Sequence, residues 1–148
     1  LYPESLVLAT DVLAPDGLTD HEPFDFDHYL SRVEARCDGD LVCLDTVDLQ
    51  PTAGRPSDSA TMGEFSSVGT LYAFTPALDT AALAETVHDA VESGEETTAG
   101  VSELADGAGL TVRVLGHGTD AVEATIRTAW KVLRRETLDS EIPADRWY

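Results

Sequence analysis

The densest group of side chains that could do chemistry lies between residues 20 and 28. It consists of acidic residues and two histidines: Asp20, His21, Glu22, Asp25, Asp27 and His28. Carboxylate oxygens and imidazole nitrogens bind divalent metals such as nickel or zinc. Asp25 and Asp27 would point to the same face of a strand. One hypothesis is therefore a small acidic metal-dependent hydrolase that uses the Asp20–His28 cluster. The other is a solvated strand face in an acidic protein.

No known catalytic motif supports the hydrolase. The sequence has no HExxH, CxxC or GxSxG, and no serine, histidine and aspartate in a recognisable triad order. His88 is predicted to lie at the surface of a helix. His117 stands between two glycines before a predicted helix, where an anion could bind, but this signal is weak. We therefore predict no catalytic residue and no enzyme activity.

Aromatic residues close the chain. Trp147 and Tyr148 either pack on the core of the domain or anchor a partner protein, and the sequence leaves both options open. Trp130 differs because it falls on the apolar stripe of a predicted helix, which favours a place in the core.

Charge is the most unusual bulk property. The 148 residues include 28 acidic and nine basic side chains, for a formal net charge of −19. Such a surface repels phosphates and anionic lipids, so nucleic acid and membranes are excluded as main partners. The acidic residues are scattered along the chain, which favours adaptation to high salt over a surface that handles a metal cation.

The periodicity of apolar residues predicts one α+β domain over residues 1–148, mainly of antiparallel strands. Two amphipathic helices in the C-terminal half, Thr80–Ser93 and Asp120–Thr137, are expected to pack on the sheet. Asp79 is the expected N-cap of the first helix, and Gly94 its expected stop. Strands are predicted at Ser5–Leu13, Phe24–Cys37, Asp40–Leu49, Val68–Phe74, Ala99–Leu104 and Leu110–Val114.

A hairpin is predicted around Asp38-Gly39, a typical two-residue turn. Its simple register places Cys37 opposite Asp40, Cys43 opposite Glu34, and Arg32 opposite Asp45 as an ion pair. Val33, Ala35 and Cys37 would then share a face with Val42 and Leu44. A disulfide between Cys37 and Cys43 is not expected, and two thiols favour a reducing cytosol.

Short motifs occur in order along nearly the whole chain. They are Leu1-Tyr2-Pro3, Glu22-Pro23-Phe24, Arg36-Cys37-Asp38-Gly39, Val68-Gly69-Thr70-Leu71-Tyr72, the run GLTVRVLG at 109–116, Trp130 with Arg134, and Arg146-Trp147. Together they resemble the C-terminal half of the urease accessory protein family UreD, called UreH in some bacteria. The family's Gly-Arg before the glutamate is missing here, and its glycine-rich N-terminal half is absent.

The resemblance implies the C-terminal portion of a non-enzymatic scaffold for nickel insertion. Its partners would be the subunits of apo-urease and the accessory proteins UreF and UreG. No tightly bound cofactor is implied, but transient nickel on an internal polar route is. Glu22 is the acidic residue in a family-like motif that would line this route, and Asp45 is a weaker candidate. Both helices and Trp147 and Tyr148 would offer partner surfaces.

The acidic composition suggests a version of this protein from a halophilic archaeon, located in the cytoplasm. Two rival functions stay open at this point. One is the hydrolase of the Asp20–His28 cluster, and the other is a β+α protein-binding module unrelated to urease.

Overall fold

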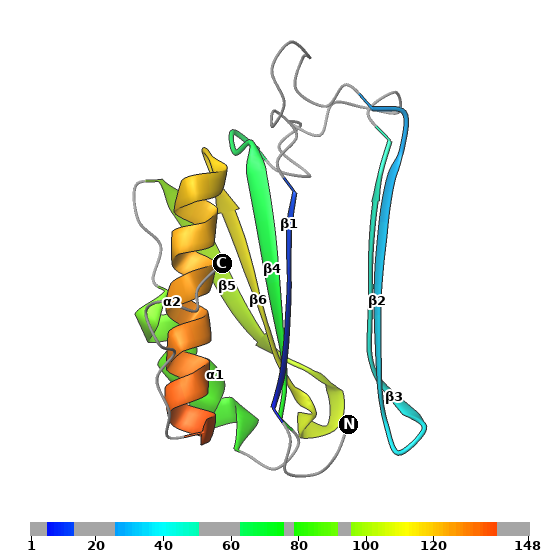
Figure 1. Cartoon of the computed structure of the whole chain (residues 1–148), viewed down its shortest axis with the longest axis vertical. Helices are drawn as coiled ribbons and strands as arrows, with labels where there is room; N and C mark the ends of the chain where they lie inside the picture. The colour runs from blue at the N-terminus through cyan, green and yellow to red at the C-terminus, as the bar shows by residue number, and fades with distance from the viewer. Residues whose placement is uncertain (1–5, 14–25, 51–62, 76–78, 92–95, 139–148) are drawn as a thin grey trace.

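Strands and helices form three layers in the part of the chain that the computed structural model describes, residues 6–13, 26–50, 63–75, 79–91 and 96–138 (Figure 1). The elements are β1 (Val7–Leu13), β2 (Tyr29–Cys37), β3 (Asp40–Leu49), β4 (Ser67–Phe74), α1 (Thr80–Ala90), β5 (Thr97–Glu103), η2 (Ala105–Gly107), β6 (Gly109–Gly116) and α2 (Thr119–Leu138). The middle layer is an antiparallel sheet in the order β1-β4-β6-β5. Both helices cover one face, and the β2–β3 hairpin lies on the other. The predicted α+β class is confirmed.

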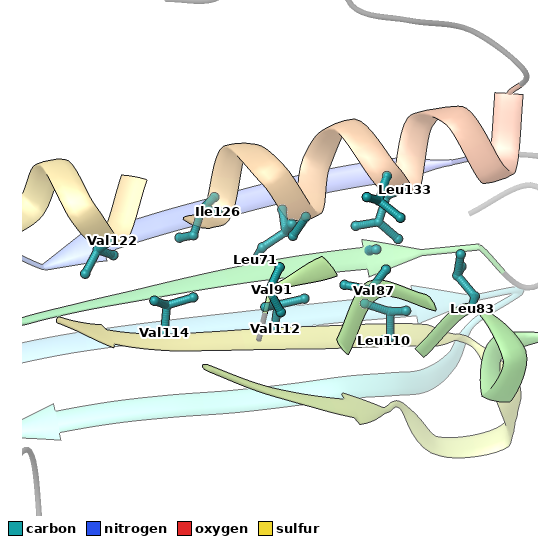
Figure 2. Packing of buried hydrophobic residues seen from close by; sticks show 13 residues of the cluster. Leu71, Leu83, Val87, Val91, Leu110, Val112, Val114, Val122, Ile126 and Leu133 are labelled. Carbon is teal, nitrogen blue, oxygen red and sulfur yellow. The ribbon is translucent and has the colours of Figure 1, made fainter. Parts of the chain in front are cut away.

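The main core fills the space between the sheet and the helices (Figure 2). Every residue of β4 except Val68 is buried, because this strand is central and has a layer on each side. The apolar stripe of α2 is buried as predicted, and Trp130 packs half-buried against the core. The largest fully buried apolar side chains are Leu71, Leu110, Leu133, Val87, Val112, Val114 and Val122.

Helix α2 approaches β4 closely at Gly69. A Cβ atom there would lie 2.6 Å from Cγ1 of Val122 and would also overlap the side chain of Ile126. Only glycine lets the helix pack at this separation.

Helix α1 begins where the sequence predicts. The carboxylate of Asp79 accepts a hydrogen bond from the backbone N–H of Ala82, at 3.2 Å. The helix ends at Ala90, three residues before the predicted end, and the expected stop at Gly94 lies outside the described residues. Ala90 itself is exposed, and the buried apolar residues of this segment are Leu83, Val87 and Val91.

Replacing this cap gives a small, local prediction. Asp79→Ala should lower the free energy of unfolding by about 1 kcal/mol, because one N–H group of the first turn loses its acceptor. Urea denaturation followed by circular dichroism measures the change. Asp89→Ala, in the last turn of the same helix, is the control and should be neutral or slightly stabilising, because a negative charge there opposes the helix dipole. Equal losses for both variants would contradict the capping role.

Tight turns join neighbouring strands as predicted. Asp38 and Gly39 have φ angles of 51° and 95°, as the mirror-image turn of a two-residue hairpin requires. Asp106 and Gly107 also have positive φ within η2, which connects β5 to β6. Strand β2 begins at Tyr29 rather than at Phe24, because β3 ends at Leu49, directly opposite Tyr29. The described residues before Tyr29, 26–28, therefore have no residue of β3 to pair with.

The predicted register of the hairpin is correct at the turn and wrong beyond it. Cys37 does lie opposite Asp40, but a β-bulge between Ala35 and Arg36 then shifts the pairing by one residue. Cys43 therefore lies opposite Ala35, not Glu34. Asp45 lies opposite Val33, not Arg32.

The shift turns β3 over, because side chains alternate between the two faces of a strand. Cys43 and Asp45 face the sheet, whereas Leu44 is exposed instead of sharing the face of Val33. The predicted ion pair between Arg32 and Asp45 does not form. Cys37 and Cys43 are thiols and not a disulfide, as expected.

Candidate functional site between the hairpin and the sheet

A polar cluster joins β3 to the face of the sheet that the helices leave uncovered. Asp45 of β3 accepts a hydrogen bond from the hydroxyl of Tyr72 on β4, at 2.7 Å. The same carboxylate oxygen forms an ion pair with the guanidinium group of Arg113 on β6. The Asp45 side chain is only 27% exposed. It therefore connects two layers in a setting where water competes weakly for its hydrogen bonds.

Apolar contacts surround this cluster on one side. Cys43, Tyr72 and Phe74 are buried together, with Val33, Ala35 and Leu104 packed half-buried against them. Burial raises the pKa of the Tyr72 hydroxyl, and the hydrogen bond to Asp45 raises it further. Burial also raises the pKa of the Cys43 thiol, with a smaller contribution from the charge of Asp45. Both groups are therefore held in their neutral forms at physiological pH.

A second polar link joins the hairpin to the edge of the sheet. Asp11 of β1 accepts hydrogen bonds from the Tyr29 hydroxyl at 3.0 Å and from the Ser31 hydroxyl at 3.3 Å, both on β2. Burial raises the pKa of Tyr29, and its hydrogen bond to Asp11 adds to the effect. Carboxylates on β1 and β3 thus attach the two strands of the hairpin to the sheet at separate points.

Open clefts lie between the described layers, and Arg113 lines two of them. The first has a volume of about 330 Å³ and includes Asp11, Tyr29 and Thr70 in its wall. The second, of about 500 Å³, lies toward the other end of the hairpin and includes Asp45, Tyr72 and Glu103. Carboxylates, hydroxyls and apolar side chains therefore line both clefts.

The clefts are lined by polar groups, but these groups do not form a metal-binding site in the described part of the chain. Within the described ranges no group of three or more His, Cys, Asp or Glu is placed to hold a metal ion. Asp11 and Asp45 already accept two hydrogen bonds each. A cation entering the clefts would have to compete with these donors, so it would bind weakly.

Comparison with known proteins assigns this chain to a family. The profile of the UreD urease accessory protein family matches residues 1–148. The chain belongs to the UreD family. The UreD urease accessory protein of Natronomonas pharaonis is 49% identical over 148 residues, which are all of this chain and 50% of that protein. The UreD of Haloquadratum walsbyi is 47% identical over 143 residues, which are 97% of this chain and 47% of that protein. The predicted resemblance to UreD of halophilic archaea is confirmed.

This UreD chain spans about half the length of the curated relatives it matches. The names of the family and of these relatives describe an accessory protein of urease, not an enzyme. Among the described helices, none combines the length and the apolar character that crossing a bilayer requires.

Several of the residues that sequence patterns singled out lie outside the described part of this UreD chain. These are Asp20, His21, Glu22, Asp25, Trp147 and Tyr148. Of the 20–28 cluster, Asp27 is exposed, and His28 Nε2 lies 3.0 Å from a carboxylate oxygen of Asp48. His28 thus pairs across the hairpin in the described structure.

The other two histidines occupy ordinary positions. His88 is exposed on α1, as predicted. The ring of His117 lies 4.9 Å from that of Phe65, centroid to centroid, and its backbone N–H donates to Glu96 O at 3.2 Å. The Gly-His-Gly segment therefore has structural contacts of its own.

Sequence reasoning missed the two partners of Asp45 in this UreD fold. Tyr72 stands in an apolar strand and Arg113 in an alternating one, so each looks like an ordinary strand residue. Asp45 was expected to pair with Arg32 on the neighbouring strand. Nothing in the alternation of β3 marks the bulge that turns Asp45 toward the sheet, so the sequence carried no signal for this cluster.

The buried hydroxyl of Tyr72 predicts a loss of stability at alkaline pH. Its pKa in the folded chain is raised above the unfolded value near 10, so its contribution is complete below about pH 10 and is lost as the pH rises further. Between about pH 9 and about pH 11, the chain should lose more stability than a Tyr72→Phe variant. Urea denaturation at both pH values measures this difference, and Tyr29 titrates in both chains. Equal losses would show that Tyr72 is not held neutral by the fold.

Proposed function

We propose that this UreD chain works in urease maturation, as part of a scaffold that binds apo-urease and other accessory proteins while nickel is inserted. The observation that carries the proposal is the match to the UreD family over every residue of the chain. The proposed partners are the urease subunits and the accessory proteins UreF and UreG. In this role the protein acts by contact, as a chaperone does, in the cytoplasm.

Nickel handling in this proposal is transient. Carboxylates that line the clefts, among them Asp11 and Asp45, offer oxygen ligands to a passing ion, and Glu22 is proposed to line the same route. A route must release the ion that enters it, so weak ligation suits the task better than a closed cage of thiolates or imidazoles. No tightly bound cofactor is required.

The partner surfaces are proposed on the outer faces of the helices and on the terminal aromatics. α1 and α2 bury one face on the sheet and leave the opposite face exposed. Trp147 and Tyr148 are of the residue types that most often anchor protein interfaces. Both helices cover the face of the sheet opposite to the hairpin, so a partner bound to their outer faces would not require the hairpin to move (Figure 1).

A pull-down at high salt tests the proposal. The tagged chain, alone and joined to the remaining half of the Natronomonas UreD, is mixed with apo-urease subunits, UreF and UreG. Capture of urease together with an accessory protein is the expected result, and Trp147→Ala with Tyr148→Ala should weaken it. Failure of both chains to capture any of these proteins would overturn the proposed function.

Nickel transfer needs its own measurement. Urease activated in the presence of the joined chain should gain less nickel when Glu22→Ala or Asp45→Ala is introduced, as measured by its metal content. The control is Asp40→Ala, because this exposed carboxylate beside the turn of the hairpin lines neither cleft. Unchanged nickel content with both test variants would rule out the route, even if the pull-down succeeded.

A further inference from the structure

Exposed apolar side chains gather on one side of this molecule. Five large hydrophobic residues are exposed in the described part of the chain, and three of them are leucines of the β2–β3 hairpin: Leu30 at 59%, Leu41 at 45% and Leu44 at 51%. A fourth, Val7, lies on the edge strand β1. The helical face contributes only Leu138. Scattered exposed leucines are ordinary, but three on one short hairpin are not.

The three leucines share the face of the hairpin that points away from the sheet. Leu30 lies opposite Asp48, Leu44 opposite Glu34, and Leu41 opposite Arg36. These partners are exposed positions, whereas the alternate residues of β2 and β3 are half-buried or buried toward the sheet. We call Leu30, Leu41 and Leu44 the outward leucine face. Among the described elements, none lies beyond this face in Figure 1.

Few contacts within the described structure hold the β2–β3 hairpin in place. Two strands form its whole sheet, and only Cys43 among their residues is buried. Clefts of about 330 and about 500 Å³ separate it from the sheet beneath. An isolated two-stranded hairpin is at best marginally stable, and it usually gains stability from a further strand or a covering layer. The outward leucine face is the surface on which such a layer would pack.

The length of the UreD relatives indicates what would cover the outward leucine face. The curated relatives are about twice as long as the part that this chain matches. A complete UreD protein therefore holds a second half that must pack somewhere. We propose that the outward leucine face of β2–β3 is the docking surface for the half of a UreD chain that these 148 residues do not span. The second half would cover the three leucines and fix the hairpin onto the sheet.

The charged residues beside the leucines do not oppose this packing. Glu34 accepts hydrogen bonds from Arg36 at 2.7 Å and from Arg32 at 3.0 Å, and both arginines lie on the same face of β2. These side chains neutralise one another in part along β2. The leucines of β3 remain open to contact.

A binding experiment between the two halves tests the proposal. The half of Natronomonas UreD outside the matched 148 residues is expressed as a separate chain and titrated into this chain at high salt. The double variant Leu30→Asp/Leu44→Asp should weaken binding at least tenfold. The matched control is Leu138→Asp, another exposed leucine, on α2, and should leave binding unchanged. Circular dichroism verifies that each variant is folded.

Hydrogen exchange supplies a second readout. Addition of the other half should slow exchange of the amides of β2 and β3 in the wild-type chain more than those of β5 and α2. Equal binding by the double variant, or no binding of the other half, would overturn the proposal. Self-association of this chain that the leucine substitutions abolish would show that a second copy is the occupant. The pull-down of urease is a separate measurement, so it can succeed when this proposal fails.

Discussion

A chain that carries Gly109→Ala should be far less stable than the original chain. Gly109 has a φ of 148°, a backbone conformation that side chains rarely adopt, and a Cβ atom there would overlap the carbonyl oxygen of Ala73 on β4. The obstacle is backbone, so no change of rotamer relieves it. Strain of about 1–3 kcal/mol at such a φ and a similar cost of overpacking together remove about 2–6 kcal/mol. This is a large part of the stability of an ordinary domain.

Gly100→Ala is the matched control for this prediction. Gly100 lies in β5 of the same sheet, and a Cβ atom there would meet nothing within 4 Å. Its unfolding transition should be close to that of the original chain. Thermal denaturation of both variants measures the contrast. A Gly109→Ala chain that melts like the Gly100→Ala chain would show that β6 can shift away from Ala73 at little cost.

Local patterns were enough to predict most of the fold from the sequence. Alternation located β6, helical spacing located α2, and helical spacing together with the N-cap Asp79 located α1, because these signals depend on neighbours within one element. Positive φ angles at Asp38 and Gly39 follow from the turn that these residue types favour. Such features need no knowledge of which elements pack together.

The division into two β layers could not be predicted in this way. Nothing local distinguishes β2 and β3, which form the separate hairpin, from the strands of the four-stranded sheet. The bulge at Ala35 and Arg36 could not be predicted from the sequence either, because any of several positions in the hairpin could hold the extra residue. The bulge decides which side of β3 faces the sheet. Without it, the predicted register placed Asp45 beside Arg32 on the surface of the hairpin, whereas Asp45 in fact lies between the hairpin and the sheet.

The candidate site was missed for the same reason. Its three residues come from three strands that are far apart in the sequence, Asp45 on β3, Tyr72 on β4 and Arg113 on β6. The clustered acids and histidines near residue 20 were more conspicuous, but close spacing in a sequence does not bring side chains to one point. The resemblance to UreD pointed to Asp45 as a weaker candidate but not to Tyr72 or Arg113.

Replacing Asp45 should free the hairpin from the sheet. Asp45→Ala removes the acceptor of the buried Tyr72 hydroxyl and the ion pair of Arg113 in one step. An unsatisfied buried donor costs about 1–3 kcal/mol. The half-exposed Arg113 adds less, because water can solvate its guanidinium group. We expect a loss of about 1–3 kcal/mol in the free energy of unfolding and faster amide exchange in β2 and β3 than in β5 or β6.

Asp48→Ala is the control on the same strand. Asp48 pairs with His28 at the surface, where both side chains are about half exposed, so its loss should cost at most about 0.5 kcal/mol. Urea denaturation gives the global change for each variant, and hydrogen exchange gives its location. If Asp45→Ala changes the exchange of the hairpin no more than Asp48→Ala does, then apolar packing around Cys43 and Phe74 holds the two layers together, and the polar cluster only lines the clefts. If the hairpin alone exchanges faster, then Asp45 sets how firmly the two layers of this UreD chain are joined.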